Sequence, residues 1–166
     1  MKAVIILLFI LSMFQVEAYS QTLWKNAKYG MTFKQVQLIF PKGSQPKEKR
    51  ENGLEHLWDI DNVEVSSVHF IVKFYFMENK LKEIVLETDI SPGMFYAGRL
   101  KFDELFNVLK SKYGEPLSSK DETIGERTYL DANWIKGNLS ILLSCWGKEM
   151  EKPNFTIVYG SVKQNV

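Results

Sequence analysis

The chain has 166 residues, with 21 Lys and Arg against 20 Asp and Glu, 45% hydrophobic residues and one cysteine. This length fits one domain or two closely packed halves. A net charge of +1 argues against a nucleic-acid-binding protein, which normally carries a basic excess. The aromatic content of 13% excludes a disordered chain, and the lone Cys145 excludes a disulfide scaffold and a metal site built on cysteine pairs.

The first twenty residues have the three parts of a secretory signal peptide. Lys2 gives a positive start, an apolar run covers residues 3–11 and continues to Phe14, and small-residue cleavage patterns end at Ala18 and Ser20. The run is shorter than the about 20 apolar residues that span a bilayer, so an uncleaved anchor is the weaker alternative. We therefore expect a periplasmic or secreted protein, cleaved near Ala18 or Ser20, without a stable membrane anchor.

The first part of the remaining chain, residues 21–90, predicts one helix followed by three strands. Thr32 is a suitable N-cap because its hydroxyl can accept a hydrogen bond from a free amide of the first turn. The helix should end at Pro41, which cannot continue it. Apolar patterning then predicts strands over residues 54–60, 65–77 and 81–88.

The second part, residues 91–166, predicts the same order of elements. Apolar residues at helical spacing predict a longer helix over residues 95–113, with Gly114 as its C-terminal cap and Pro116 beyond it. Apolar patterning predicts strands over residues 128–136, 139–146 and 155–162.

The two parts also share a spacing, because Pro41 and Pro116 are separated by nearly the same distance along the chain as Trp58 and Trp134. We therefore predict an α+β fold with two layers, in which tandem helix-then-three-strand repeats form an antiparallel sheet with the helices on one face. The signal peptide (1–20) would precede two units, 21–90 and 91–166, of one compact domain. Two unrelated α+β stretches are the alternative.

Residues 29–36, Tyr-Gly-Met-Thr-Phe-Lys-Gln-Val, and the ending Phe40-Pro41 resemble the start of the first helix in two related groups of exported proteins. These are the SmpA/OmlA (BamE) outer-membrane assembly lipoproteins and the secreted β-lactamase-inhibitor proteins. The chain lacks the lipid-bearing cysteine of the first group and the disulfide pairs of the second, so anchoring and inhibition do not carry over. The resemblance implies an α+β fold and a non-catalytic envelope protein that binds another macromolecule.

Residues with catalytic or metal-binding chemistry are few. Asp59 and Asp61 share one face of a predicted strand and His56 lies on the other, so these three residues form no common site unless the strand is bulged. We expect His69 at the surface, and Cys145 as a buried, inert thiol because it continues an apolar row. The chain has no Gly-x-Ser-x-Gly motif and no glycine-rich phosphate loop. We therefore expect no enzyme activity, no catalytic residue, no metal and no cofactor.

The alternation of side chains along two strands predicts a binding surface. One apolar row in each strand should face the helices: Val68, Phe70, Val72, Phe74 and Phe76, and Leu139, Ile141, Leu143 and Cys145. Ile71, Tyr75, Leu142 and Trp146 then lie on the opposite face, and Tyr and Trp are frequent in interface hot spots. These four residues are the predicted partner-binding residues. The alternatives are that another segment covers them, or that they are scattered surface residues.

The function predicted from these observations is a non-catalytic exported protein-interaction module of the bacterial envelope, periplasmic or secreted. Its partner would be an envelope or extracellular protein, and not a nucleic acid. A carrier of an apolar small ligand, held in a pocket between helices and sheet, is the main alternative. An enzyme of unrecognised type comes third.

Overall fold

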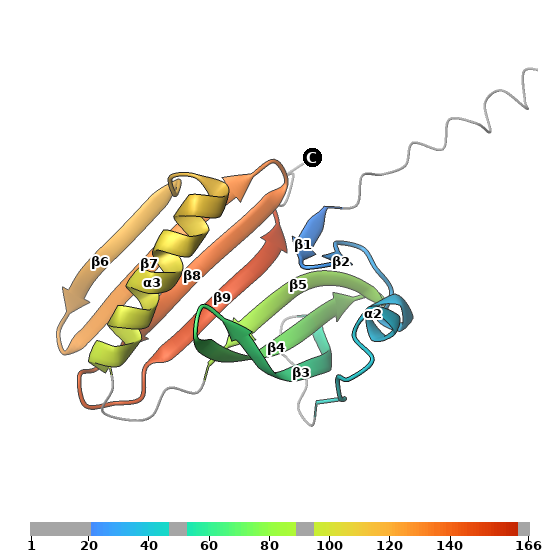
Figure 1. Ribbon diagram of the computed structural model, residues 1–166, viewed down its shortest axis with the longest axis horizontal. Coiled ribbons are helices and arrows are strands. Elements are labelled where there is room, and N and C mark those ends of the chain that lie inside the picture. The colour runs from blue at the N-terminus through green and yellow to red at the C-terminus, as the bar shows by residue number, and fades with distance from the viewer. Residues whose placement is uncertain (1–20, 47–52, 89–94, 163–166) are drawn as a thin grey trace, which may run out of the picture.

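The computed structural model describes residues 21–46, 53–88 and 95–162, so the predicted signal peptide lies outside the described residues. A seven-stranded antiparallel sheet forms most of the molecule, with the strand order β3-β4-β5-β9-β8-β7-β6 (Figure 1). The elements in chain order are β1 (Thr22–Trp24), β2 (Ala27–Lys28), α2 (Phe33–Ile39), β3 (Glu55–Val65), β4 (Val68–Met77), β5 (Lys80–Glu87), α3 (Phe95–Tyr113), β6 (Ser118–Ile124), β7 (Arg127–Lys136), β8 (Leu139–Gly147) and β9 (Asn154–Ser161).

One row of buried side chains crosses six neighbouring strands of the sheet, from β3 at one edge to β7. Residues paired directly across neighbouring antiparallel strands point to the same face, and each strand from β3 to β7 in the sheet order contributes one member. The row consists of Trp58, Phe74, Ile84, Tyr159, Ile141 and Trp134. All six are buried, so a single apolar core extends across six of the seven strands, all except the edge strand β6.

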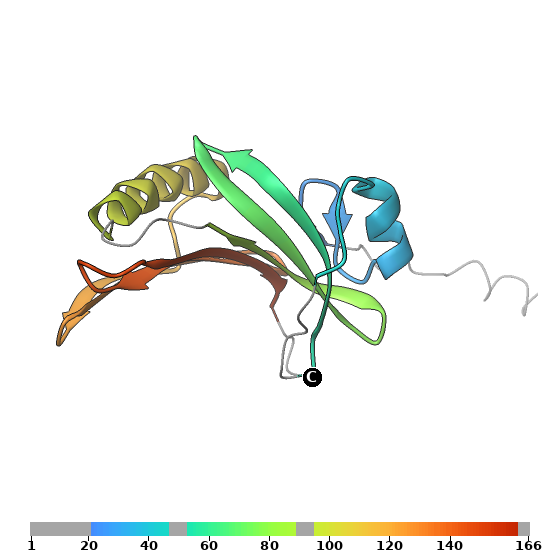
Figure 2. The ribbon, with the colours of Figure 1, turned by 90° about the horizontal axis from the view of Figure 1, so that it is seen from below.

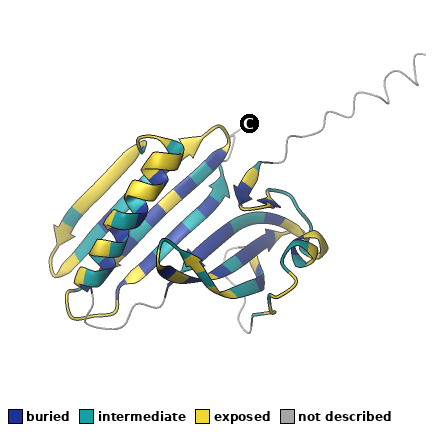
Figure 3. Ribbon diagram, in the orientation of Figure 1, coloured by how far each residue is buried: buried dark blue, intermediate teal, exposed yellow. Residues whose placement is uncertain are grey.

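Both helices pack on the face that carries this row. Phe40, at the end of α2, lies 5.2 Å from Phe74 between ring centroids, and Phe106 of α3 lies 5.6 Å from Trp134. Figure 2 shows α3 running along one side of strands β6 to β9. The sheet side of α3 is buried, while Tyr96 and Leu100 on the helix are exposed (Figure 3).

The local sequence accounts for both helix positions. Thr32 caps α2 as predicted, with its hydroxyl accepting from Gln35 N and the Gln35 side chain accepting from Thr32 N in a capping box. In α3, Gly98 lies against Cys145 of β8 and Pro153, because a Cβ atom at Gly98 would sit 3.3 Å from the Cys145 Sγ. The missing side chain lets α3 approach the sheet closely.

The two tryptophans at the ends of the row make similar hydrogen bonds. Trp58 Nε1 donates to the backbone oxygen of Phe40 at 3.1 Å, and Trp134 Nε1 donates to the backbone oxygen of Gly114 at 2.9 Å. Each acceptor is at the end of a helix, where backbone carbonyls lack an intrahelical partner. Each buried indole therefore ties the C-terminal end of a helix to the sheet.

The predicted α+β fold, with two layers and tandem helix-then-three-strand repeats, is wrong. Strands make up 54% of the described structure and the two helices only 20%. The helix α2 has seven residues, too few for a layer, and the C-terminal part has four strands, not three. The predicted boundary between 90 and 91 lies outside the described residues.

The strand β6 was missed because its sequence carries no apolar alternation. Its residues Ser-Ser-Lys-Asp-Glu-Thr-Ile are almost all exposed, since the strand lies at the edge of the sheet. Pairing of its backbone with β7, from Ser118–Asn133 to Ile124–Arg127, and not burial of side chains, makes this segment a strand. The charged side chains also suit an edge, because they discourage pairing with another chain.

Candidate functional site

The face of the large sheet opposite the helices is called the open face here, because no described helix or strand covers it over β6 to β9 (Figure 2). Its residues alternate with the buried row along each strand. From β3 to β6 it carries His56, Asp59, Ile71, Lys73, Tyr75, Glu83, Val85, Glu87, Asn154, Thr156, Val158, Ser140, Leu142, Ser144, Trp146, Arg127, Tyr129, Asp131, Asn133, Ile135, Ser118, Lys120, Glu122 and Ile124.

All four predicted partner-binding residues lie on the open face, and three of them are exposed. Ile71, Leu142 and Trp146 are 37%, 39% and 36% exposed, whereas Tyr75 is only 8% exposed. The Tyr75 ring stacks on His56 with centroids 4.8 Å apart, so the prediction that Tyr75 is an accessible contact residue is wrong.

The four residues do not form one continuous patch. Ile71 and Tyr75 are on β4, Leu142 and Trp146 are on β8, and strands β5 and β9 lie between. Three strand spacings separate the two pairs by about 14 Å. Polar side chains, including Glu87 and Thr156, fill part of the interval. Ile135 of β7 and Ile124 of β6 are also exposed on this face. The exposed apolar side chains are therefore spread over β6, β7 and β8, with Ile71 standing apart.

Trp146 belongs to a cluster of aromatic and basic side chains that the sequence analysis did not identify. Tyr129 lies directly across from Trp146 on β7, and the two rings are nearly parallel, at 22°, with centroids 6.4 Å apart. The Arg127 guanidinium and the Lys120 ammonium each lie 5.8 Å from an aromatic ring, of Trp146 and Tyr129 respectively. The pairing of β7 with β8 brings this cluster together. In the sequence, its only sign is that each of these two strands has an aromatic residue on the side that faces away from the helices.

Next to this cluster, a surface groove of about 670 Å³ crosses strands β6, β7 and β8. Its open-face lining residues are Ser118, Lys120, Asp131, Asn133, Ser140 and Leu142. Asp131 Oδ1 accepts a hydrogen bond from Ser144 Oγ at 2.6 Å, and Lys120 pairs with Glu122. The Asn133 Oδ1 atom is buried and has no hydrogen-bond partner in the described structure.

A second polar group on the open face involves His56, at a strand bulge, which is the exception allowed when His56 and Asp59 were predicted to lie on opposite faces. The register of β3 against β4 shifts between His56 and Trp58, and this bulge places His56 on the same face as Asp59. His56 Nε2 contacts Asp59 Oδ1. Because His56 is buried under Tyr75, the pair fixes the bulged end of β3 and leaves the imidazole little access to a substrate.

Lys73, the residue between Ile71 and Tyr75 on the open face, pairs with Glu87. Burial alone would lower the pKa of Lys73, but the hydrogen bond to Glu87 and the negative charge of Glu87 outweigh it and raise the pKa above its ordinary value. The ammonium group is therefore held in its charged, paired form. On this face Lys73 therefore neutralises the negative charge of Glu87.

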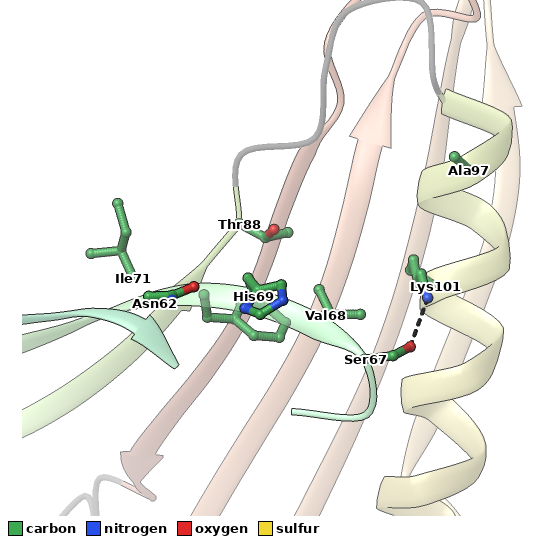
Figure 4. A pocket seen from close by; sticks show the side chains of 9 residues that line it. Asn62, Ser67, Val68, His69, Ile71, Thr88, Ala97 and Lys101 are labelled. Atoms are coloured by element: carbon green, nitrogen blue, oxygen red, sulfur yellow. Dashed lines mark hydrogen bonds between the residues drawn. The ribbon is translucent and has the colours of Figure 1, made fainter. Parts of the chain in front are cut away.

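Away from the open-face groove, a cleft of about 430 Å³ lies between the start of β4 and α3 (Figure 4). Val68, Phe70 and Ala97 give it apolar walls. Lys101 of α3 donates to Ser67 Oγ at 2.9 Å across its edge. His69 is exposed, as predicted, and also lines the cleft.

The lone cysteine is buried and unpaired, as predicted. Burial raises the pKa of the Cys145 thiol to about 12, with a smaller contribution from Asp131. The thiol is therefore protonated at neutral pH and sits on the helix side of the sheet, away from both surface sites. Such a group is a poor nucleophile.

Among residues 21–46, 53–88 and 95–162, no group of three or more His, Cys, Asp or Glu is placed to hold a metal ion. The two described helices are also not long and apolar enough to cross a membrane.

A scan against models of protein families, a search of curated proteins and a search of solved structures each find no match for this chain. The resemblance of residues 29–41 to the SmpA/OmlA (BamE) and β-lactamase-inhibitor groups therefore stays a prediction that no comparison supports or refutes.

Proposed function

We propose that this protein is an exported, non-catalytic module that binds another protein of the bacterial envelope or the extracellular space through the open face of its sheet. The observation that carries the proposal is the exposure of Leu142 and Trp146, which lie on the same side of β8, on a face that no described helix or strand covers. A Trp flanked by a second aromatic ring is typical of interface hot spots.

The charges on the open face indicate the chemistry of the partner. Lys73 is paired with Glu87 and Lys120 with Glu122, so the face offers no block of charge of one sign. A partner with an apolar or aromatic side chain at the centre of its surface, surrounded by uncharged polar groups, fits such a face better than a strongly acidic or basic partner.

Site-specific crosslinking in the native envelope tests the proposal. A photoreactive residue replaces Leu142 or Ile71 on the open face, and matched variants replace Tyr96 or Leu100, which are exposed on α3. We expect the same protein partner to be captured from the open face only, and Trp146→Ala to reduce that capture at least tenfold. Equal capture from α3, or capture unaffected by Trp146→Ala, would contradict docking on the open face.

The proposal includes no catalytic step. The one thiol is buried and protonated, and the His56–Asp59 pair is covered by Tyr75. The burial of these groups favours structural roles for Cys145 and His56.

A carrier of an apolar small ligand is the second candidate, and the cleft between β4 and α3 favours it. The volume of about 430 Å³ and the apolar walls lie within the usual range for small-ligand sites. Fluorescence of the lipophilic probe N-phenylnaphthylamine should then rise on mixing with the protein. Ala97→Phe, which fills the cleft, should abolish that rise, whereas Ala132→Gly, on β7 outside the cleft, should not.

A further inference from the structure

The polar groove across β6, β7 and β8 has the layout of a binding site for a small, highly hydroxylated ligand. Its lining side chains come from paired positions of three strands: Lys120 is opposite Asp131, and Ser118 is opposite Asn133, which in turn is opposite Leu142. Rigid strand pairing therefore fixes hydroxyl, amide, carboxylate and ammonium groups on one surface without any described loop. A site built on strands holds its polar groups more firmly than a site built on loops.

The Asn133 side chain supplies the strongest sign that a ligand belongs there. Asn133 lines the groove. Its Oδ1 atom is shielded from solvent and accepts no hydrogen bond from the described residues. Buried acceptors in native proteins are nearly always satisfied. Rotation of the Asn133 amide toward the groove would let this oxygen accept a hydrogen bond from a ligand hydroxyl or amide N–H.

The charges in the groove favour an uncharged ligand. Lys120 is paired with Glu122, and the Asp131 carboxylate already accepts from Ser144. The remaining hydrogen-bonding capacity belongs largely to the hydroxyls of Ser118 and Ser140 and to the Asn133 amide. These groups both donate and accept, which matches hydroxyl groups better than a phosphate or a metal ion.

The aromatic pair lies beside the groove, because Tyr129 is the next residue after Asp131 on the open face of β7. Trp146 is four residues from Leu142 on β8, which is about 13 Å along the strand. Its ring is 36% exposed, and the neighbouring Tyr129 ring is nearly parallel to it. The C–H face of a sugar ring is apolar and stacks on such a surface, while the hydroxyls at its rim reach polar side chains.

We infer that this surface is a carbohydrate-binding site that takes a neutral oligosaccharide, with Trp146 and Tyr129 as the stacking platform and Asn133, Asp131 and Ser118 as hydrogen-bonding partners. The inference goes beyond docking of a protein partner and does not depend on it. Oligosaccharide binding is a property of the isolated protein, whereas docking is measured by crosslinking in the envelope, so either result can fail while the other holds.

Titration of the protein, purified after export, with cellohexaose and with the hexamer of N-acetylglucosamine, both neutral, tests the inference by calorimetry and by NMR. We expect at least one of these β-linked sugars to bind and to shift the amide signals of β7 and β8. Trp146→Ala should weaken that binding at least tenfold. Tyr96→Ala is the matched control, because Tyr96 is 71% exposed on α3, and it should bind as the wild type does.

Asn133→Leu separates binding from folding. Because the Asn133 Oδ1 atom has no partner in the described structure, its replacement by an apolar side chain of similar size should leave the midpoint of unfolding unchanged or raise it. The same variant should lose at least tenfold in sugar affinity. Unchanged sugar affinity in Asn133→Leu would overturn the inference.

Three other results would also overturn it. The first is that neither sugar binds the wild type. The second is that the shifted signals lie at the β4–α3 cleft and not at β7 and β8. The third is that Trp146→Ala and Tyr96→Ala lose affinity equally, which would show that the platform has no special part in binding.

Discussion

At the scale of single residues, Gly43 sits where the chain after α2 passes closest to β3. A Cβ atom at this position would lie 2.2 Å from Trp58 Nε1 and 2.5 Å from the Asp59 backbone oxygen. Ser44 and Asp59 exchange two backbone hydrogen bonds of 2.9 Å at the same place, so neither segment can move away without losing them. The glycine is required by the close approach of two backbones.

Gly43→Ala should therefore lower the free energy of unfolding by about 2 kcal/mol or more, because the added methyl must displace a buried indole or break the Ser44–Asp59 pairing. Urea denaturation followed by circular dichroism measures the change. Gly160→Ala on β9 is the matched control, since a Cβ atom there meets no other atom within 4 Å. Equal stability of the two variants would show that the 41–46 segment is not held against β3.

Cys145 leads to a prediction about pH. Its pKa is raised from an ordinary value of 9.0 to about 12 in the folded protein. The folded state therefore favours the protonated thiol, and the stability this contributes is complete below pH 9 and lost as the pH rises toward 12. The free energy of unfolding should fall less steeply over this interval in Cys145→Ala than in the wild type. Iodoacetamide should also modify Cys145 at pH 8 only after unfolding; rapid modification of the folded protein would show that the thiol is accessible.

At the scale of elements, the sequence predicted which side chains of a regular strand face the core, but it did not predict where a strand is bulged. The apolar rows of β4 and β8 face the core as predicted, because side chains alternate with a fixed period of two and one face is buried. The bulge between His56 and Trp58 adds one residue to β3 and has no signature in the local sequence. It reverses the expected face of His56, and for that reason Tyr75, although correctly placed on the open face, is buried and not available to a partner.

Tyr75→Ala and Trp146→Ala should consequently behave differently, although both residues belong to the open face. Tyr75→Ala removes a buried ring stacked on His56 and should cost about 3 kcal/mol of unfolding free energy. Trp146→Ala should change the same quantity by about 1 kcal/mol or less, because its ring is partly exposed. Thermal and urea unfolding of both variants measure the difference. A loss for Trp146→Ala as large as that for Tyr75→Ala would make Trp146 a core residue.

At the scale of the whole molecule, one seam joins the N-terminal strands to the C-terminal strands. Strands β5 and β9 pair from Glu83–Gly160 to Glu87–Thr156, and the buried rows of the core cross this seam without interruption. The similar helix-and-strand order along the chain predicted two repeats in one antiparallel sheet, but the sequence alone could not show which strands meet at the seam. Long-range strand pairing depends on contacts between distant residues, which local patterning does not contain.

A core that crosses the seam should unfold in one cooperative step. Leu86 of β5 tests this, because it is fully buried and paired with Val72 on one side and Ile157 on the other. Leu86→Ala should cost about 2–5 kcal/mol and should lower the hydrogen-exchange protection of slow amides in β4 and in β8 by the same factor. Leu100→Ala, on the exposed side of α3, should leave both sets of amides unchanged. Loss of protection confined to β4 would instead mean that the strands on either side of the seam unfold separately, and the open face would then be two surfaces whose relative position is not fixed by the core.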